Sequence, residues 1–268
     1  MGSLLQDLRY GIRMLVKNPG FTTIALLTLS LGIGGNATVF SWVQSVLLHP
    51  LPAIQHSDRL VAIETIMPNG EYHTSSYPDF RDYHDQNQVF SGLVGFELVP
   101  VNMTWAGNKQ EQRVWGEIVT ENYFDVLGVR AERGRLFGTK ERGALNGDPY
   151  IVLSYPFWQR QFGGKPNMIG QTVDINNRSF TVVGIAPRGF QGTIVGVAPD
   201  YWVPMMMQPV ILPGEDLQQR SPTFVHLMGV LKPGVTLAQA QADLSTIARR
   251  LAREYPQSDR GIGMAVNP

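Results

Sequence analysis

The chain has no cysteine among its 268 residues, and it has no net charge, because 22 Lys and Arg residues balance 22 Asp and Glu residues. The lack of cysteine excludes disulfides and thiolate metal sites. It fits an extracytoplasmic domain, although a cytosolic protein can lack cysteine too. Zero net charge removes the electrostatic footprint of a nucleic-acid-binding protein, so we expect no nucleic-acid partner.

Charged residues are also absent from one long stretch, since residues 18–57 contain no Asp, Glu, Lys or Arg. Within it, Phe21–Leu48 is mainly apolar, and a helix needs roughly 20 such residues to cross a bilayer core. We predict a transmembrane helix at 21–48. The alternative is a signal peptide cleaved near Gly35–Ala37, but the apolar run resumes after Ala37 and is too long for such a leader.

Basic residues precede the predicted span. Arg9, Arg13 and Lys17 are opposed only by Asp7, and such an excess of positive charge favours the cytoplasmic side. The sequence therefore predicts a membrane protein with a cytoplasmic N-terminus. Everything after about Pro50 is predicted to lie outside the cytoplasm.

Two further patterns surround the span. Residues 1–20 are predicted to form an amphipathic interfacial helix, because apolar residues recur there at helical spacing; a solvated basic run is the alternative. Inside the span, a patch of small residues could admit a second helix or mark a flexible point. The apolar set is Leu4, Leu5, Leu8, Ile12 and Leu15, and the small set is Ser30, Gly32, Gly34, Gly35 and Thr38.

The remaining residues, 49–268, predict an α+β domain in which short strands and short helices are segregated. Thr120, Ser154 and Thr236 are predicted helix caps, and Asn176–Asn177 a tight turn. The last helix is expected to bury Leu237, Ala240, Leu244, Ile247 and Leu251. Strands are predicted at 60–66, 93–105, 113–119, 150–153, 171–175, 179–185 and 224–231, and a helix at 77–85.

No catalytic motif is present. Gly163–Gly164–Lys165 lacks the spacing of a phosphate-binding loop and is predicted to end a helix. Ser154 lacks the flanking glycines of a nucleophile elbow. The histidines show no zinc spacing: His49, His56, His73, His84 and His226.

Asp79, Asp82 and Asp85 recur every three residues. They could gather a cation, but a solvated helix face is the favoured interpretation, because a calcium site needs more converging oxygens than one helix presents. We therefore assign no catalytic, cofactor-binding or metal-binding residue and no cofactor. The substrate-binding residues remain unassigned, and the chain is predicted not to be an enzyme.

Several strings resemble one family along nearly the whole chain, in the expected order. The strings are Leu5–Phe21, Leu26–Ser41, Ser76–Phe80, Asn122–Val129, Gly134–Phe137, Val152–Gly164, Ile169–Gly170, Thr181–Phe190 and Leu231–Leu244. They resemble MacB/FtsX-like ABC transporter permeases, closely so at the start of the chain, and in particular the large acidobacterial-type members.

The resemblance implies a protein of the bacterial inner membrane, with a first transmembrane helix followed by a periplasmic core domain at 49–268. That domain would have a porter-like α+β part, 58–119 and 214–268, and an inserted, more β-rich subdomain, 120–213. It implies a homodimer or permease pair in membrane lipid, a separate cytoplasmic ABC ATPase and a periplasmic adaptor. The function it implies is ATP-driven movement of the outer domain for export, or for transfer of lipoproteins or antimicrobial compounds.

The sequence departs from the family in having no second apolar span and no fused ATPase. We therefore expect a fragment or truncated form of a longer permease, with ATP hydrolysis supplied by another subunit. Two alternatives remain: a single-span sensor or binding protein, and a membrane-anchored enzyme. About 20 residues before the span are too few for a sensor's output module, and the enzyme would need a convergent cluster of titratable groups.

Overall fold

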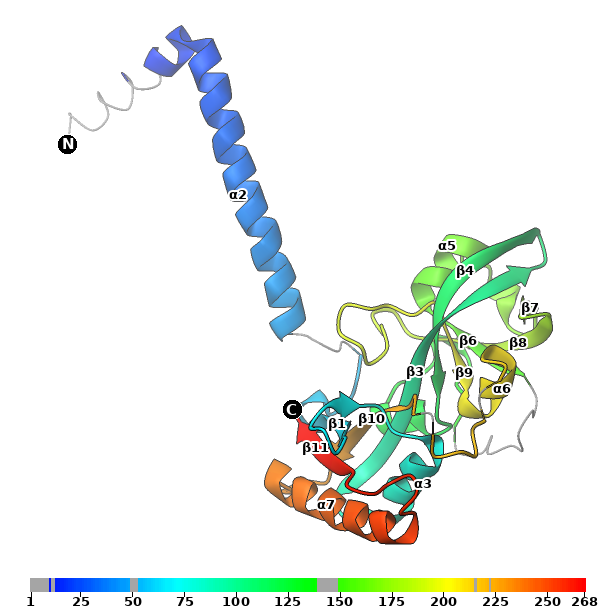
Figure 1. Ribbon diagram of the computed structural model, residues 1–268. Helices are drawn as coiled ribbons and strands as arrows, with labels where there is room; N and C mark the ends of the chain where they lie inside the picture. The colour runs from blue at the N-terminus through cyan, green and yellow to red at the C-terminus, as the bar shows by residue number, and fades with distance from the viewer. Residues whose placement is uncertain (1–9, 11–12, 49–52, 139–148, 215, 222) are drawn as a thin grey trace. The chain divides into compact units, whose positions relative to one another are not determined.

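The computed structural model describes residues 10, 13–48, 53–138, 149–214, 216–221 and 223–268 (Figure 1). The chain divides into two compact units, Met1–Pro50 and Leu51–Pro268. The N-terminal unit contains helix α2, Pro19–Leu48, which is 30 residues long. Most of the predicted interfacial helix at 1–20 lies outside the described residues, but Tyr10 and residues 13–17 are helical.

Several threonines of helix α2 bond to backbone carbonyls of the same helix. The hydroxyl of Thr28 donates to the carbonyl of Ile24 over 2.6 Å, and that of Thr38 donates to the carbonyl of Gly34 over 2.8 Å. A hydroxyl in hydrocarbon is costly without a partner, and the backbone carbonyl one turn earlier provides one. Thr23 bonds to Pro19 in the same way.

The outer unit, Leu51–Pro268, is built on one 11-stranded sheet, with the order β11-β1-β10-β3-β4-β9-β6-β8-β5. Strand β2 pairs with β1, and β7 pairs with both β3 and β8. The strands are β1 (Leu60–Ile66), β2 (Tyr72–His73), β3 (Phe90–Trp105), β4 (Asn108–Val119), β5 (Arg133–Gly134), β6 (Tyr150–Leu153), β7 (Thr172–Ile175), β8 (Arg178–Ile185), β9 (Tyr201–Pro204), β10 (His226–Leu231) and β11 (Gly263–Asn267).

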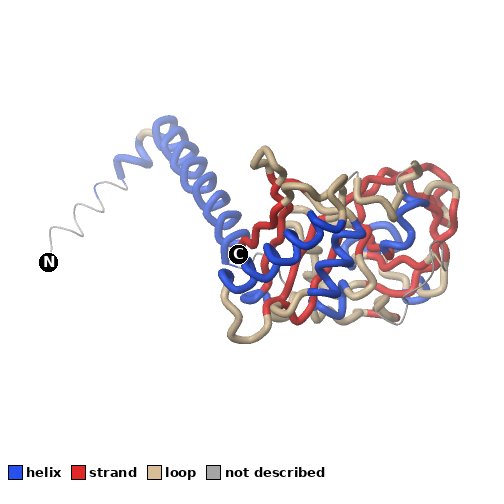
Figure 2. Tube along the Cα trace, turned by 60° about the horizontal axis from the view of Figure 1, so that its bottom comes forward, coloured by secondary structure: helices blue, strands red, loops and turns tan. Residues whose placement is uncertain are grey.

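Helices and short 3-10 turns connect these strands. The α-helices of the outer unit are α3 (Tyr77–Gln86), α4 (Tyr123–Leu127), α5 (Tyr155–Phe162), α6 (Gln208–Ile211) and α7 (Leu237–Glu254). The 3-10 turns are η1 (Ser57–Arg59), η3 (Pro166–Met168) and η4 (Met205–Met207). Strand β3 pairs with β10 through its first half and with β4 and β7 further along. Figure 2 shows the strands in red and the helices that pack beside them in blue.

The sheet separates two hydrophobic cores, because neighbouring side chains of a strand point to opposite faces. Val61, Leu93 and Ile118 belong to the first core, whereas their neighbours Val94 and Val119 belong to the second. The first core contains buried residues of α3, α5 and α7: Phe80, Tyr83, Phe157, Trp158, Ala240 and Leu244. The second contains α4 and the segment after β8: Tyr123, Phe124, Leu127 and Phe190.

The predicted helix ends are largely confirmed. The side chain of Ser154 accepts the Phe157 amide, and Thr236 forms a capping box with Gln239. Gly128 and Gly163 end α4 and α5 in the left-handed conformation, with φ of 67° and 62°. Asn176 and Asn177 both have positive φ in the turn between β7 and β8.

Two local predictions are wrong. Asn122, not Thr120, is the residue before α4. The Thr120 hydroxyl instead accepts a hydrogen bond from the Gly95 amide, which links the segment between β4 and α4 to strand β3. Leu237, expected in the buried stripe of α7, is 38% exposed, because it occupies the first helical turn. The other four residues of that stripe are buried.

Candidate functional site

Helix α2 is the part of the chain suited to a membrane. Its segment Pro19–Thr38 is long and apolar enough to cross a bilayer. Large side chains such as Phe21, Leu27 and Leu31 are more than half exposed in the protein alone. An apolar helix that is uncovered on its described faces is stable only in contact with lipid or other helices. We therefore treat α2 as the membrane-anchoring element.

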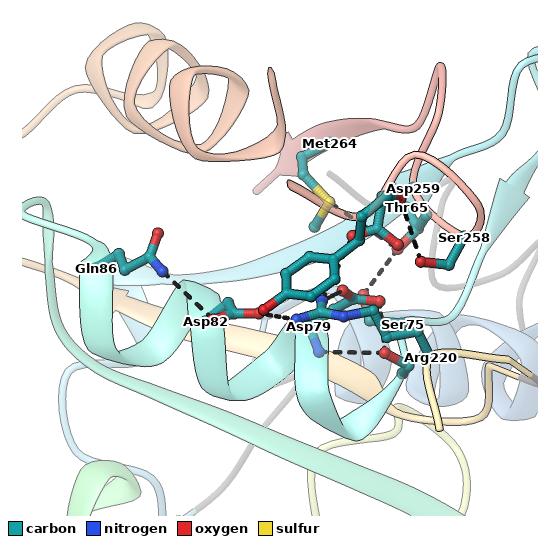
Figure 3. A network of polar contacts seen from close by, with 11 residues as sticks. Thr65, Ser75, Asp79, Asp82, Gln86, Arg220, Ser258, Asp259 and Met264 are labelled. Atoms are coloured by element: carbon teal, nitrogen blue, oxygen red, sulfur yellow. Dashed lines mark hydrogen bonds and ion pairs between the residues drawn. The ribbon is translucent and has the colours of Figure 1, made fainter. Parts of the chain in front are cut away.

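In the outer unit, the most heavily charged buried cluster surrounds Arg220 (Figure 3). Its guanidinium forms ion pairs with Asp79 and Asp82 on α3, and a longer one, 3.4 Å, with Asp259 beyond α7. The guanidinium carbon also lies 3.6 Å from the centre of the Tyr255 ring. The Arg220 side chain thus joins the segment before β10 to helix α3 and to the segment after α7.

The cluster has more negative than positive charge. Burial alone would lower the pKa of Arg220, but the hydrogen bond that it donates to Asp82 and the charges of Asp79, Asp82 and Asp259 raise that pKa above its usual value. Burial raises the pKa of Asp259. The adjoining cavity measures only about 10 Å³, so it holds no organic ligand. The arrangement is suited to holding three segments in register.

A second buried polar group is centred on Glu117 of β4, which is completely buried. Trp202 Nε1 donates to Glu117 Oε2 over 2.7 Å, and the Tyr123 hydroxyl donates to the same oxygen over 2.9 Å. The Thr193 hydroxyl lies 3.2 Å from that of Tyr123. These bonds connect β4, β9, α4 and the segment after β8.

Burial raises the pKa of Glu117 to about 7, although hydrogen bonds from Trp202, Tyr123 and the Thr193 backbone act to lower it. No ionised side chain contributes to this shift; the groups that face the carboxyl are a neutral indole, a phenol and a threonine. With no nucleophile or second acid facing it, the carboxyl can exchange a proton but lacks the partners for acid–base hydrolysis.

The acids and histidines singled out from the sequence are not gathered into one site. Asp79 and Asp82 bind Arg220, whereas Asp85 is exposed beside His84. The favoured interpretation of a solvated face is therefore wrong for Asp79, which is buried. Within the described ranges, no group of three or more His, Cys, Asp or Glu residues could hold a metal ion.

The remaining candidates have ordinary structural surroundings. Ser154 caps α5, and Gly163 and Gly164 follow that helix with positive φ. His226 stacks on Phe96 with ring centres 5.4 Å apart. His73 is exposed beside Glu71, and His49 lies outside the described residues.

A hollow of about 530 Å³ opens between η1, α3, the start of β3 and α4. Its polar lining includes His56, Arg59, His84 and Asn122. No sequence pattern predicts this hollow, because its residues come from four separate segments. The same holds for Arg220, whose partners Asp79 and Asp259 are 141 and 39 residues away.

A family model, the MacB-like periplasmic core domain, matches residues 22–247, from the beginning of α2 to the second half of α7. The chain belongs to this family. The MacB-like periplasmic core domain is a part of ABC transporter permeases, so the resemblance to MacB-like permeases is confirmed, and so is the α+β fold. The narrower resemblance to the acidobacterial-type members stays a prediction. A comparison with curated proteins gives no match.

Solved structures agree with the family. A permease-protein domain from Porphyromonas gingivalis has a TM-score of 0.60 and 15% identity, and the match covers 80% of this chain and 92% of that one. The periplasmic region of MacB from Actinobacillus actinomycetemcomitans has a TM-score of 0.57 and 14% identity, covering 82% and 93%. The extracellular domain of the ABC-type transporter YknZ from Gram-positive bacteria has a TM-score of 0.55 and 12% identity, covering 78% and 100%.

These three likenesses establish the fold of the MacB-like domain alone, because their identities are low. The family membership and the apolar helix α2 together identify a membrane-anchored component of an ABC transporter permease. Such a component is not itself a catalytic enzyme. The family implies association with an ABC ATPase.

Proposed function

We propose that the chain is the permease subunit of a MacB-like ABC transporter, or the N-terminal portion of one. In this proposal, a separate cytoplasmic ATPase drives movement of the periplasmic domain. The observation that carries the proposal is the extent of the family match. It includes both α2 and the outer unit, so membrane helix and outer domain belong to one family module.

The way in which η1 and β1 are bonded to the sheet supports a role for the outer unit in transmitting movement. After the segment that follows α2, the chain forms η1 and then β1, which pairs with both β10 and β11. Arg59 of η1 donates to the carbonyl of Leu231 on β10 over 3.0 Å. A displacement that enters at η1 would therefore act on an interior strand, which has ladder bonds on both sides, and not on a loosely held edge.

The proposed arrangement has a cytoplasmic N-terminus and a periplasmic outer unit in the inner membrane. Its partners would be a second permease copy or a paired permease, membrane lipid and a periplasmic adaptor. The proposed cargo is an exported compound, such as an antimicrobial, or a lipoprotein. Within the outer domain, we propose a porter-like part at 58–119 and 214–268 and an inserted subdomain at 120–213.

The coupling is tested by purifying the full-length parent protein from membranes and assaying ATP hydrolysis. We expect a stoichiometric ATPase subunit to copurify, with hydrolysis that rises when the complex is reconstituted in lipid. A parent protein that purifies alone and never stimulates an ATPase would favour the single-span binding protein instead.

The orientation is tested separately with single cysteines, because the natural chain contains none. Ala106 is exposed in the turn between β3 and β4. We expect a membrane-impermeant maleimide, once admitted to the periplasm, to label Ala106→Cys while the inner membrane is intact. Ser3→Cys should be labelled only after that membrane is lysed. The reverse pattern would contradict the proposed topology.

A further inference from the structure

The hollow beside η1 belongs entirely to the outer unit, and neither the Arg220 cluster nor the Glu117 cluster lines it. With a volume of about 530 Å³, it can hold a small organic ligand or a head group, whereas the cavity beside Asp259 cannot. Gly92 forms part of its wall, and the side chain of Val126 occupies the place where a Cβ of that glycine would lie. The wall is therefore built by close packing of α4 on β3.

Arg59 gives the hollow a fixed positive charge. Among the residues that the structure describes, its one hydrogen bond runs from Nη1 to the Leu231 carbonyl. A guanidinium has five N–H groups, so most of them remain available to a ligand. The bond to β10 also holds the side chain in place, which lowers the entropic cost of binding.

Two imidazoles border the same space. His56 has a φ of 58°, in the left-handed region that non-glycine residues seldom adopt, and such strain persists where the surrounding structure maintains it. The Nδ1 atom of His84 lies 2.8 Å from Asp85 Oδ1. Because a carboxylate can only accept, the Nδ1–H group of His84 donates to Asp85, which leaves Nε2 for a ligand.

The one acid that lines the hollow is already engaged. The carboxylate of Asp125 lies against Gly138, where a Cβ would come within 2.7 Å of Oδ2, and Asp125 has an interaction of its own. The amide nitrogen of Asn122 is bonded to the Leu93 carbonyl, and the Ser91 hydroxyl to the Val230 carbonyl. The groups left to meet a ligand are therefore mainly the cation and the imidazoles.

We propose that this hollow binds the phosphate group of a ligand, with Arg59 as the principal charged donor and His56 and His84 beside it. Arg matches the tetrahedral oxygens of phosphate through paired N–H groups. The hollow is also larger than a lone carboxylate requires. Soluble phosphate esters and phospholipid head groups both carry the required group.

The test measures binding to the full chain in a neutral detergent by isothermal titration calorimetry. The probes are inorganic phosphate, glycerol 3-phosphate and succinate, followed by vesicles of phosphatidylglycerol or of phosphatidylcholine. The variants are Arg59→Gln and His56→Asn, since asparagine tolerates the left-handed conformation. Arg81→Gln, at an exposed position on α3 outside the hollow, is the matched control.

We expect at least one phosphate probe to bind, with affinity reduced about tenfold in Arg59→Gln and unchanged in Arg81→Gln. The smaller loss expected in His56→Asn supports the site even if Arg59→Gln unfolds. Tighter binding of glycerol 3-phosphate identifies a soluble ligand, whereas vesicle binding that is weakened in Arg59→Gln and unchanged in Arg81→Gln identifies a head group.

Three outcomes overturn the inference: no binding of any phosphate probe, equal effects of Arg59→Gln and Arg81→Gln, or succinate binding as tightly as phosphate. The measurement needs no ATPase and no transport. A failure to bind phosphate would therefore leave the permease proposal intact. A parent protein that does not stimulate an ATPase would likewise leave the proposed phosphate site intact.

Discussion

Glu117 and Trp202 are register partners in the parallel pair of β4 and β9, and their side chains are joined by a hydrogen bond of 2.7 Å. The bond lies in the second core, sealed from solvent by the segment that carries Thr193 and Phe190. A carboxyl at that position makes the stability of the outer domain depend on pH.

The first prediction concerns this dependence. In the unfolded chain the Glu117 carboxyl has a pKa near 4.5, and burial raises the pKa of Glu117 to about 7 in the folded domain. Between these values the folded state binds more protons, so the free energy of unfolding should fall as the pH rises from 4.5 to 7. The full difference is about 3 kcal/mol.

Denaturant unfolding of residues 53–268 between pH 4.5 and 8 measures this slope, and Glu117→Gln should flatten it. Glu254→Gln, which changes an exposed acid at the end of α7, should leave it unchanged. His226 has a pKa lowered by burial and opposes the slope just below pH 6.5. An identical slope in Glu117→Gln and the natural chain would refute the assignment.

The second prediction concerns Arg220. Replacing it by Met leaves Asp79, Asp82 and Asp259 without their common cation, and a buried charge that loses its partner costs about 3–5 kcal/mol. Arg220→Lys should recover part of the loss, because it restores the charge without the paired N–H geometry. Chemical denaturation is the measurement.

The control for Arg220 is Arg250→Met. Arg250 is exposed on α7 and bonds only to Gln86 among the described residues, so we expect a change below about 0.5 kcal/mol. Comparable losses in both variants would mean that the cluster contributes no more than a surface contact.

The third prediction concerns Gly116, where a Cβ would overlap the ring of Tyr201. Gly116→Ala forces that fully buried ring away from β4, and we expect a loss of about 1–3 kcal/mol in thermal or denaturant unfolding. At Gly263 the nearest atom to such a Cβ is 3.6 Å away, an ordinary contact, so Gly263→Ala should be close to neutral. Equal stability of the two variants would contradict this account.

The fourth prediction concerns the start of α7. The Thr236 hydroxyl accepts the Gln239 amide, and the Gln239 side chain accepts the Thr236 amide. Thr236→Ala removes one half of this box and should cost about 1 kcal/mol. Thr246→Ala, at an exposed position inside the same helix, should cost little, since its hydroxyl donates back to the Ala242 carbonyl and accepts only from the exposed side chain of Arg249 among the described residues. A loss in Thr246→Ala as large as in Thr236→Ala would argue against the cap.

Features that depend on nearby residues could be predicted from the sequence. Ser154 and Thr236 cap helices through bonds that span three residues, and Asn176 and Asn177 adopt positive φ because of their own side chains. The span at 21–48 was likewise visible as a stretch without charge. The structure shows that this span is part of one continuous helix, α2, which begins at Pro19.

Features that depend on distant residues could not be predicted. Alternation along β4 puts Glu117 on the same face as Arg113 and Trp115, which are exposed, but Glu117 is covered by a segment that follows β8. Asp79 likewise resembled a solvated acid on a helix face, because nothing near it in the sequence identifies Arg220. Only the folded topology brings such partners together.

The 16-residue strand β3 is long enough to act as a lever arm within the outer domain. At about 3.4 Å per residue it extends for roughly 50 Å. Strand β10 pairs with it at Phe90–Phe96, β4 at Phe96–Trp105, and β7 only at Met103–Trp105. One continuous strand therefore connects the β10 pairing to the β3–β4 turn, so a small rotation imposed where β10 meets β3 would become a larger displacement at that turn.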